Sequence, residues 1–359
     1  MQRRHFLLAG SGLLASALIS ACGGGDEEAP ALLTRRNVTD WSAQERDDFI
    51  ATLHAMKDTP SAYRPDTNAY DYFVAIHVEA FATHSVNAHM SAGFLPWHRE
   101  MLKRFELELR RVSGNPQMTL GYWDWHQPGA HAQIFTPDFL GGNGDANDNF
   151  LVKDGAFKAG AWTLNSALFD DTPDEFTDTD GDGKIDPNNF AGPLTSAGLT
   201  RRFVYQGDVQ SDLSCVDTLM ASRPLAQLFE RQVYDAAPYM EYAEALSPSE
   251  AFNLFDEWTD VSMRKFLEAR WHNPIHAIIG GQMGASSSPN DPAFFLHHCN
   301  VDRIWALWQS RYANTGYPSA TENLDTSAGT TLDILSQAGV VRFQDTFDLA
   351  QHSGVRYAD

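Results

Sequence analysis

Histidines are concentrated in two separate parts of this sequence. In the second half of the chain, His272 and His276 are separated by three residues, and His298 follows within an apolar run. Far upstream, His89 and His98 are separated by eight residues. Neutral imidazole binds copper, zinc, iron or nickel, whereas a site without carboxylate or thiolate ligands disfavours magnesium, calcium and iron–sulfur clusters. Two all-histidine clusters in one chain therefore predict two metal ions of the same kind.

Helical periodicity indicates how the upstream histidines are positioned. Aromatic residues recur at near-helical spacing over residues 70–84, which predicts a helix that turns His77 inward. His84 lies near the same stripe and competes with His77 as a ligand. His98 shares an apolar face with the residues that follow it, and Gly114 is expected to end that helix.

The downstream histidines are also expected on helices. Pro274, between His272 and His276, is typical of the first turn of a helix, so a new turn should begin there. Another helix is predicted over residues 294–311, where periodicity does not separate His297 from His298. Four inward-facing segments that carry histidines imply a mainly α protein, a helical bundle with a metal site in its core.

The remaining segments frame this bundle. Asp40 or Ser42 should cap an early helix. Helical spacing returns over residues 221–242, and residues 252–269 form an amphipathic pattern. Residues 141–198 are rich in Gly, Asp and Asn, and we interpret them as a loop-rich insertion of long surface loops rather than a separate domain.

The histidine segments resemble the type 3 copper family, which comprises tyrosinases, catechol oxidases and molluscan-type haemocyanin units. The resemblance is carried by FLPWHR around His98, by the HN-x2-H pattern that starts at His272, and by GGQM followed by NDPAFFLHHCNVDR. It covers the chain from about Thr34 to the end. The resemblance implies one catalytic domain over residues 34–359, built on a four-helix-bundle core with antiparallel helix pairs, long surface loops and little β structure.

The resemblance also implies two copper ions, each bound by three histidines. It selects His77 rather than His84 as the first ligand, and His298 rather than His297, which is left beside the metal. The first copper would be held by His77, His89 and His98, and the second by His272, His276 and His298.

The chemistry that the resemblance implies is that of a tyrosinase. Monophenols would be hydroxylated to o-diphenols, and o-diphenols oxidised to o-quinones, with dioxygen as oxidant. Asn273 matches a family asparagine that holds a water proposed to take the phenol proton, and Glu268 is the best match for its partner glutamate. Ala277 and Ala285 stand where some relatives carry bulkier residues, so the substrate pocket should be open.

Several alternatives remain. A catechol or o-aminophenol oxidase would have the same ligands but little activity on monophenols. A haemocyanin-like oxygen-binding protein usually has a shielding domain or a placeholder residue over its site, and we expect neither here. A zinc protein would hold zinc ions with the same histidines and would have no oxidase activity. A separate copper-delivery partner is also compatible with the sequence.

The first residues form a targeting segment. Arg3 and Arg4 precede an apolar stretch, which is typical of a twin-arginine signal peptide over residues 1–21. Residues 19–22 resemble a bacterial lipoprotein box that would lipidate Cys22, although an ordinary signal peptide cleaved near Ala21 would look similar. Residues 22–33 are then a flexible tether, and we expect a periplasmic or cell-surface protein anchored only by its lipid.

Charge and cysteine content limit the partners further. A formal net charge of -21 disfavours nucleic acid and anionic membrane surfaces, but it does not affect a neutral phenol. Cys215 and Cys299 could form a disulfide in an exported protein. We favour free thiols, because Cys299 lies beside the histidine pair and is expected to be buried.

A separate acidic segment resembles the front of an EF-hand or dockerin calcium loop. Its carboxylates alternate with other residues, and a glycine stands at the sixth position. The twelfth position is Asn189 instead of glutamate, so the bidentate ligand is missing and a bare acidic loop is equally compatible. The candidate calcium ligands are Asp178, Asp180, Asp182 and Asp186.

Overall fold

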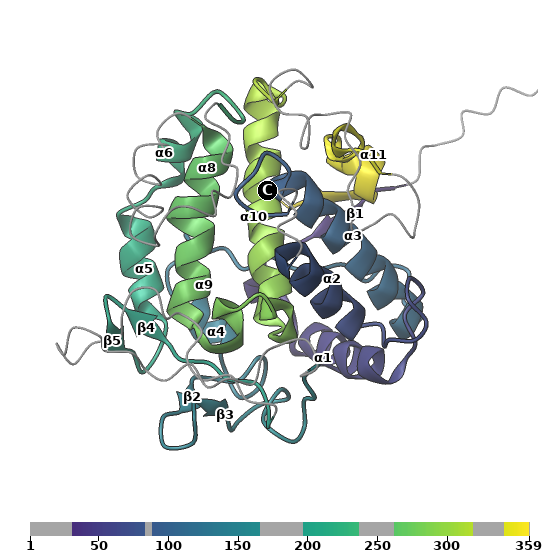
Figure 1. The fold of residues 1–359 in the computed structure, drawn as a ribbon, viewed down its shortest axis with the longest axis vertical. Helices are drawn as coiled ribbons and strands as arrows, with labels where there is room; N and C mark the ends of the chain where they lie inside the picture. Colours follow the sequence, from purple (N-terminus) through teal and green to yellow (C-terminus); the bar gives the residue numbers. More distant parts are fainter. Residues whose placement is uncertain (1–30, 83–87, 166–196, 237–261, 319–340, 359) are drawn as a thin grey trace, which may run out of the picture. The chain divides into compact units, whose positions relative to one another are not determined.

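The computed structural model describes residues 31–82, 88–165, 197–236, 262–318 and 341–358 of the chain (Figure 1). Contacts divide the chain into Met1–Ala31 and Leu32–Asp359, and the elements described belong to the second unit. This unit is mainly helical. Its α-helices are α1 (Ala43–Asp58), α2 (Asp71–Ala82), α3 (Phe94–Ser113), α4 (His131–Ile134), α5 (Ser214–Ala221), α6 (Leu225–Phe229), α8 (Met263–Leu267), α9 (Asn273–Ile279), α10 (Ala293–Tyr312) and α11 (Leu349–Ser353). Among the described helices, none combines the length and apolar character that crossing a membrane requires.

The strands are short and pair in twos. Strand β1 (Leu33–Arg35) lies parallel to β6 (Val355–Tyr357), so the first and last elements of the unit are neighbours. Strands β2 (Gly144–Asp145) and β3 (Leu151–Val152) pair antiparallel, as do β4 (Val204–Tyr205) and β5 (Asp208–Val209). The core is therefore formed by helices, as the sequence predicts.

Helices α2, α3 and α10 meet through aromatic side chains. Helix α3 packs against both α1 and α10, and α10 runs between α3 and the α8–α9 segment in Figure 1. Phe105 of α3 stacks on Phe295 of α10 with ring centroids 3.6 Å apart, and Phe73 of α2 meets Phe105 edge-on at 5.0 Å. Burying several large rings stabilises the bundle and fixes the facing of its helices.

The helix ends follow local chemistry. Ser42 caps α1 through a capping box with Glu45, which confirms one of the two expected caps. Gly114 ends α3 in the left-handed conformation at φ 68°, where glycine has no Cβ penalty. These signals are local, and the sequence predicted both.

Helix α8 continues into α9 through a π-helical turn, Glu268–His272. Helix α9 then begins at Asn273 with Pro274 in its first turn, as predicted. Proline has no backbone N–H, so the carbonyl one turn earlier loses its helical partner. That carbonyl belongs to Arg270, and it accepts a hydrogen bond from the Arg223 side chain instead. The π turn lies directly at the metal-binding pattern, where such turns are frequent.

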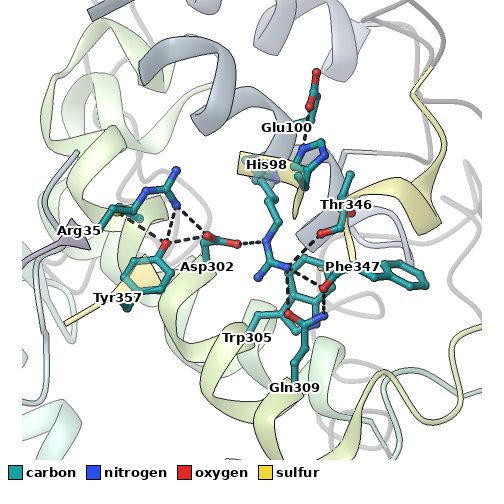
Figure 2. A network of polar contacts seen from close by, with 12 residues as sticks. Arg35, His98, Glu100, Asp302, Trp305, Gln309, Thr346, Phe347 and Tyr357 are labelled. Atoms are coloured by element: carbon teal, nitrogen blue, oxygen red, sulfur yellow. Dashed lines mark hydrogen bonds and ion pairs between the residues drawn. The ribbon is translucent and has the colours of Figure 1, made fainter. Parts of the chain in front are cut away.

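A buried ionic network joins the ends of the unit to the bundle (Figure 2). Arg35 of β1 donates two hydrogen bonds to Glu106 and one each to Asp302 and the Tyr357 hydroxyl. Figure 2 shows Asp302 beside Arg35 and Tyr357, and Arg99 donates to its other oxygen at 2.5 Å. Because every charge here has a partner, burial does not leave an uncompensated ion.

Two sequence expectations need correction. The described part of the helical pattern over residues 221–242 is interrupted, because α5 ends at Ala221 and α6 covers only Leu225–Phe229, with Pro224 between them. Residues 237–242 lie outside the described residues. The expected surface loops after Gly141 also contain core residues, since Trp162 is 1% exposed and donates to the Asn290 carbonyl at 2.9 Å. In the predicted helix over 252–269, the described part begins at Ser262, and its α-helical section ends at Leu267.

Candidate metal centre

The upstream histidines converge in the core. His77 comes from α2, His89 from the turn before α3, and His98 from the first turns of α3. One ring nitrogen from each lies within 4.8 Å of the others. The three rings meet edge-on, with His89 about 5 Å from both His77 and His98. The structure thus brings together the three residues predicted to hold the first copper. His84, the alternative to His77, lies outside the described residues.

The downstream histidines form a second group. Nε2 of His298 lies 3.2 Å from Nε2 of His272 and 3.2 Å from Nε2 of His276. His297 belongs to the same group within 4.8 Å, and its ring stacks on His272 at 5.0 Å. Both ring nitrogens of His297 are buried without a hydrogen bond inside the described part of the chain. The choice of His298 over His297 as ligand therefore stays a prediction, although the Nε2 geometry favours it.

The two groups share one space. His98 and His298 stack with ring centroids 4.3 Å apart and planes inclined by 15°. Phe94 lies between the groups, 4.9 Å from His98 and 4.8 Å from His272. Metal ions held by the two groups would face the same space and could act together on one small molecule placed between them.

Oxygen acceptors fix the tautomers of four of these histidines. Each acceptor faces a histidine Nδ1, so Nδ1 carries the proton and the Nε2 lone pair is left for a metal. The pairs are His77 with the Ser286 carbonyl (2.6 Å), His98 with the Phe94 carbonyl (2.8 Å), His272 with Asn273 Oδ1 (2.7 Å) and His276 with the Met283 carbonyl (2.6 Å).

Burial keeps these imidazoles neutral. Desolvation lowers the pKa of His77 to about 3 and that of His276 to about 4, although the hydrogen bonds from Nδ1 to backbone carbonyls oppose the shift. Desolvation followed by the neighbouring histidines lowers the pKa of His89 and His298 well below the usual value. Neutral imidazole is the form that binds metal, so the groups are ready to bind at neutral pH.

The donor set fits copper. Each group offers three or more imidazoles, and the residues gathered are all histidines. The Nε2 atom of His98 is buried and has no hydrogen-bond partner among the residues described. A buried polar atom of this kind normally has a partner, and a metal ion would provide it.

A cavity of about 210 Å³ opens beside both groups. Ala277 and Ala285 line it, together with Gly284 and Asn273. Small side chains leave room for an aromatic ring next to the histidines. The predicted substrate-pocket residues therefore lie together.

Asn273 and Glu268 occupy different places. Asn273 faces the cavity and is tied to His272. Glu268 is 1% exposed and does not line the described wall of the cavity. Its carboxylate accepts hydrogen bonds from Met90 N–H at 2.5 Å and from Arg264 at 2.8 Å. Desolvation raises the pKa of Glu268 despite the opposing Arg264 charge.

Sequence reasoning missed the backbone acceptors. The Met283 and Ser286 carbonyls come from the loop after α9, and Gly280 and Gly281 shape its start with φ of 59° and 55°. A Cβ on Gly281 would lie 2.2 Å from the Thr200 carbonyl oxygen, so only glycine fits there. The glycine pair signalled a tight turn but could not show which carbonyls reach the histidines.

Two other predicted features lie outside the described residues: the lipidation site Cys22 and the candidate calcium ligands Asp178 to Asp186. Cys215 and Cys299 are both buried free thiols, as favoured from the sequence. Burial raises the pKa of Cys299 to about 12, so it is not a reactive thiolate.

Comparison with known proteins identifies the family. The family model for the common central domain of tyrosinase matches residues 67–311. A tyrosinase from Streptomyces glaucescens is 32% identical over 303 residues, covering 82% of this chain and 89% of that protein. The chain belongs to the tyrosinase family. Grixazone synthase from Streptomyces griseus is 30% identical over 287 residues, covering 77% of this chain and 84% of that protein.

The fold agrees with this assignment. A polyphenol oxidase variant from Thermothelomyces thermophila superposes with a TM-score of 0.56 at 19% identity, covering 91% of this chain and 88% of that one. Members of the tyrosinase family bind two copper ions and act on phenols with dioxygen. The protein is accordingly a type 3 copper oxidoreductase with a helical core around its histidine groups.

Proposed function

We propose that this protein is a tyrosinase, which hydroxylates monophenols to o-diphenols and oxidises o-diphenols to o-quinones. The observation that carries the proposal is the cavity, which joins the copper-binding histidines to Asn273 through a wall of small side chains. Ala277 and Ala285 leave space for a phenol ring beside the second histidine group. When bound, the two coppers supply the activation of dioxygen and the electron transfer.

Hydroxylation requires the phenol to lose a proton whose reference pKa is about 10. We assign this step to Asn273, which lines the cavity beside His272. Its Oδ1 accepts from His272, which leaves its amide N–H groups directed away from the ligand and able to orient a water. That water removes the proton, and the raised pKa of Glu268 favours the carboxylate as the final proton acceptor. Because Glu268 is buried and does not line the described wall of the cavity, proton transfer to it would need a bridging water.

Stoichiometry separates the two activities. One monophenol and one O2 give one o-quinone and one water, whereas two catechols and one O2 give two o-quinones and two waters. Oxygen uptake by the copper-loaded protein should therefore approach one O2 per monophenol and half an O2 per catechol. Zinc-loaded protein is the matched control and should consume none. Oxygen uptake with the catechol but none with the monophenol would contradict the proposed hydroxylation.

The alternative enzyme is a catechol or o-aminophenol oxidase. The similarity to grixazone synthase keeps this candidate open, because that relative and the tyrosinases resemble the chain equally well. Comparing turnover of a monophenol, a catechol and an o-aminophenol under one set of conditions decides between them. A haemocyanin-like carrier would bind oxygen reversibly and turn over none of the three.

The N-terminal sequence supports a proposal for location. Arg3 and Arg4 would direct export of the folded, copper-loaded protein, and Cys22 would carry a lipid anchor at the periplasmic or cell surface. Cys22→Ser should release the protein from the membrane fraction. Wild-type protein that is lipid-free in its native cell would contradict the anchor. If a copper-delivery partner is required, protein produced in a host without that partner should contain fewer than two copper ions per chain.

A structural calcium ion at Asp178 to Asp186 is a further proposal from the sequence. Calcium should raise the melting temperature modestly and leave turnover unchanged. Identical melting temperatures with calcium and with chelator would contradict this proposal.

A further inference from the structure

The segment that follows His89 is held by side chains from the opposite half of the chain. Met90 adopts φ 55°, a conformation that is unfavourable for a residue other than glycine unless contacts enforce it. Its N–H donates to Glu268, which is 178 residues away in sequence. Two residues later, the Ala92 carbonyl accepts from the Tyr234 hydroxyl at 2.7 Å and the Tyr317 hydroxyl at 3.2 Å. Both flanks of this short stretch are therefore fixed from outside.

Glu268 is itself held in place by a buried ion pair with Arg264. Arg264 lies one turn earlier on the same helix and donates to Glu268 Oε2 at 2.8 Å. The same guanidinium donates to Asp235 Oδ2 from Nε at 3.1 Å and from an NH2 group at 2.7 Å. Asp235, Arg264 and Glu268 are each no more than 2% exposed. One guanidinium thus bridges two carboxylates, and its planar fork suits that geometry.

The rest of the surroundings fixes this triad. Backbone N–H groups of Met263 and Arg264 donate to the carbonyls of Val233 and Tyr234, which pins the Asp235 segment to the start of α8. Lys265 donates to the Ala236 carbonyl at 2.7 Å and lies 4.0 Å from Asp235, so it offsets the second carboxylate charge. These contacts hold the triad with Glu268 Oε1 directed at Met90.

His89 needs such support more than the other ligands of its group. His77 and His98 sit on α2 and α3, where helical hydrogen bonds define the backbone. His89 lies in a turn, so the hydrogen bonds of its neighbours in sequence help to define the backbone that carries its ring. A ligand displaced by a fraction of an ångström weakens a metal site, and outer contacts of this kind affect metal affinity by about 10- to 100-fold.

We propose that Asp235 and Arg264 are positioning residues for the first copper, acting through Glu268 and Met90 on His89. The inference rests on the binuclear copper function proposed above. It makes the helix of the second site, the α8–α9 segment that carries His272 and His276, a support for the first site as well. Loss of Arg264 should therefore weaken copper binding at the first site selectively.

Single-site backgrounds make the test site-resolved. His298→Ala leaves the first site as the main copper site, and His98→Ala leaves the second. In each background, Arg264→Met is compared with Arg264 by competition of Cu(I) with a chelator of known affinity. We expect copper binding about 10- to 100-fold weaker in the His298→Ala background, and a change of less than about twofold in the His98→Ala background.

Conservative and matched variants separate positioning from general damage. Arg264→Lys keeps the charge but cannot bridge both carboxylates, so part of the affinity should return. Arg35→Met breaks a buried ionic network elsewhere and should lower the urea midpoint without selecting between the copper sites. If Arg264→Met does not fold, Asp235→Asn is measured instead and carries the same expectation, because it keeps the side-chain shape and removes the partner charge.

The outcomes are distinct. Equal weakening in both backgrounds, or none in either, overturns the positioning role while leaving the binuclear site intact. A wild-type chain that binds fewer than two coppers contradicts the proposed function itself. Weakening confined to the first site, with recovery in Arg264→Lys, supports the proposal.

Discussion

The two histidine groups are built in different ways. In the second group, His272 and His276 lie on one continuous helix, and their Nδ1 acceptors are the adjacent Asn273 side chain and the Met283 carbonyl seven residues further on. In the first group, His98 also has a local acceptor, the Phe94 carbonyl of its own helix, but the acceptor for His77 is the Ser286 carbonyl, 209 residues away. The Nδ1 acceptors of His272 and His276 thus lie nearby in sequence, whereas the first site depends in addition on contacts that only the folded chain supplies.

This difference has a physical consequence. A ligand held by its own helix needs little beyond local folding to reach its orientation. A ligand held by distant carbonyls and carboxylates is oriented only when the elements that supply them have docked. The first site should therefore respond to packing changes far from it in sequence, while the second should respond mainly to changes in its own helices.

Removing a ligand should give the largest effect. His98→Ala and His298→Ala should each reduce bound copper from two to one per chain and lower turnover to below about a thousandth of wild type, because both metals are needed. Metal analysis and oxygen uptake check this. If His298→Ala keeps both coppers, His297 supplies the ligand and the assignment within the second group is wrong.

The copper-free protein should lose stability as pH falls from about 6.5 to 5. The folded pKa of His77 is about 3 and that of His276 about 4, so protons bind the unfolded chain first and favour unfolding. Each such histidine contributes about 1.4 kcal/mol per pH unit. This stability is fully present above the unfolded pKa and is lost as pH falls toward the folded one.

Urea unfolding with a chelator present measures this slope. His77→Phe and His276→Phe should each reduce the slope of unfolding free energy against pH by the amount that corresponds to about one bound proton. The two variants compare one residue from each histidine group directly. An unchanged slope in both variants would mean that other groups cause the acid sensitivity.

Asn273→Leu should lower the monophenol rate about tenfold more than the catechol rate, since a proton-transfer contribution of 10²–10⁴ is partly replaced by other bases. Glu268→Gln should act in the same direction. Copper content must be measured alongside, because both residues also support ligands. Equal losses on both substrates at full copper loading would assign the two residues to site support alone.

Tyr234→Phe should have the smallest effect. It removes one hydrogen bond to the Ala92 carbonyl and should cost about 1 kcal/mol of unfolding free energy. Tyr317→Phe should cost less, because its bond is longer at 3.2 Å and only part-buried. If Tyr234→Phe weakens the second copper site more than the first, the contrast between the two groups fails.

The sequence predicted the local features well. Ser42 and Gly114 mark helix ends through short-range hydrogen bonds and backbone preference, and the histidine spacing follows from helix geometry. Burial within residues 141–165 was harder to predict, because the apolar side chains there are scattered among glycines and show no helical or strand periodicity. Trp162 is buried by contacts that only the folded chain supplies: the Tyr70 ring packs against it, and the Asn290 carbonyl, distant in sequence, accepts its N–H.

The support of the site was less predictable than its ligands. Carbonyl acceptors such as Met283 and Ser286 leave no mark in side-chain chemistry. The link between Arg264 and Asp235 joins two ordinary charged residues, and only the fold shows that both are buried. Glu268 was recognised as part of the site from its position in the family pattern, yet its contact with Met90 could not be read from any spacing.

The pairing of β1 with β6 has a consequence for the order of events during synthesis. Arg35 and Tyr357 are separated by 322 residues, and their side chains meet in the buried network of Figure 2. At a translation rate of about 5–20 residues per second, Arg35 waits roughly 15 to 60 s after its own synthesis before this partner exists. Closure of the domain is therefore a late event in synthesis, and a nascent chain stalled before strand β6 would hold an arginine whose place in the core is still incomplete.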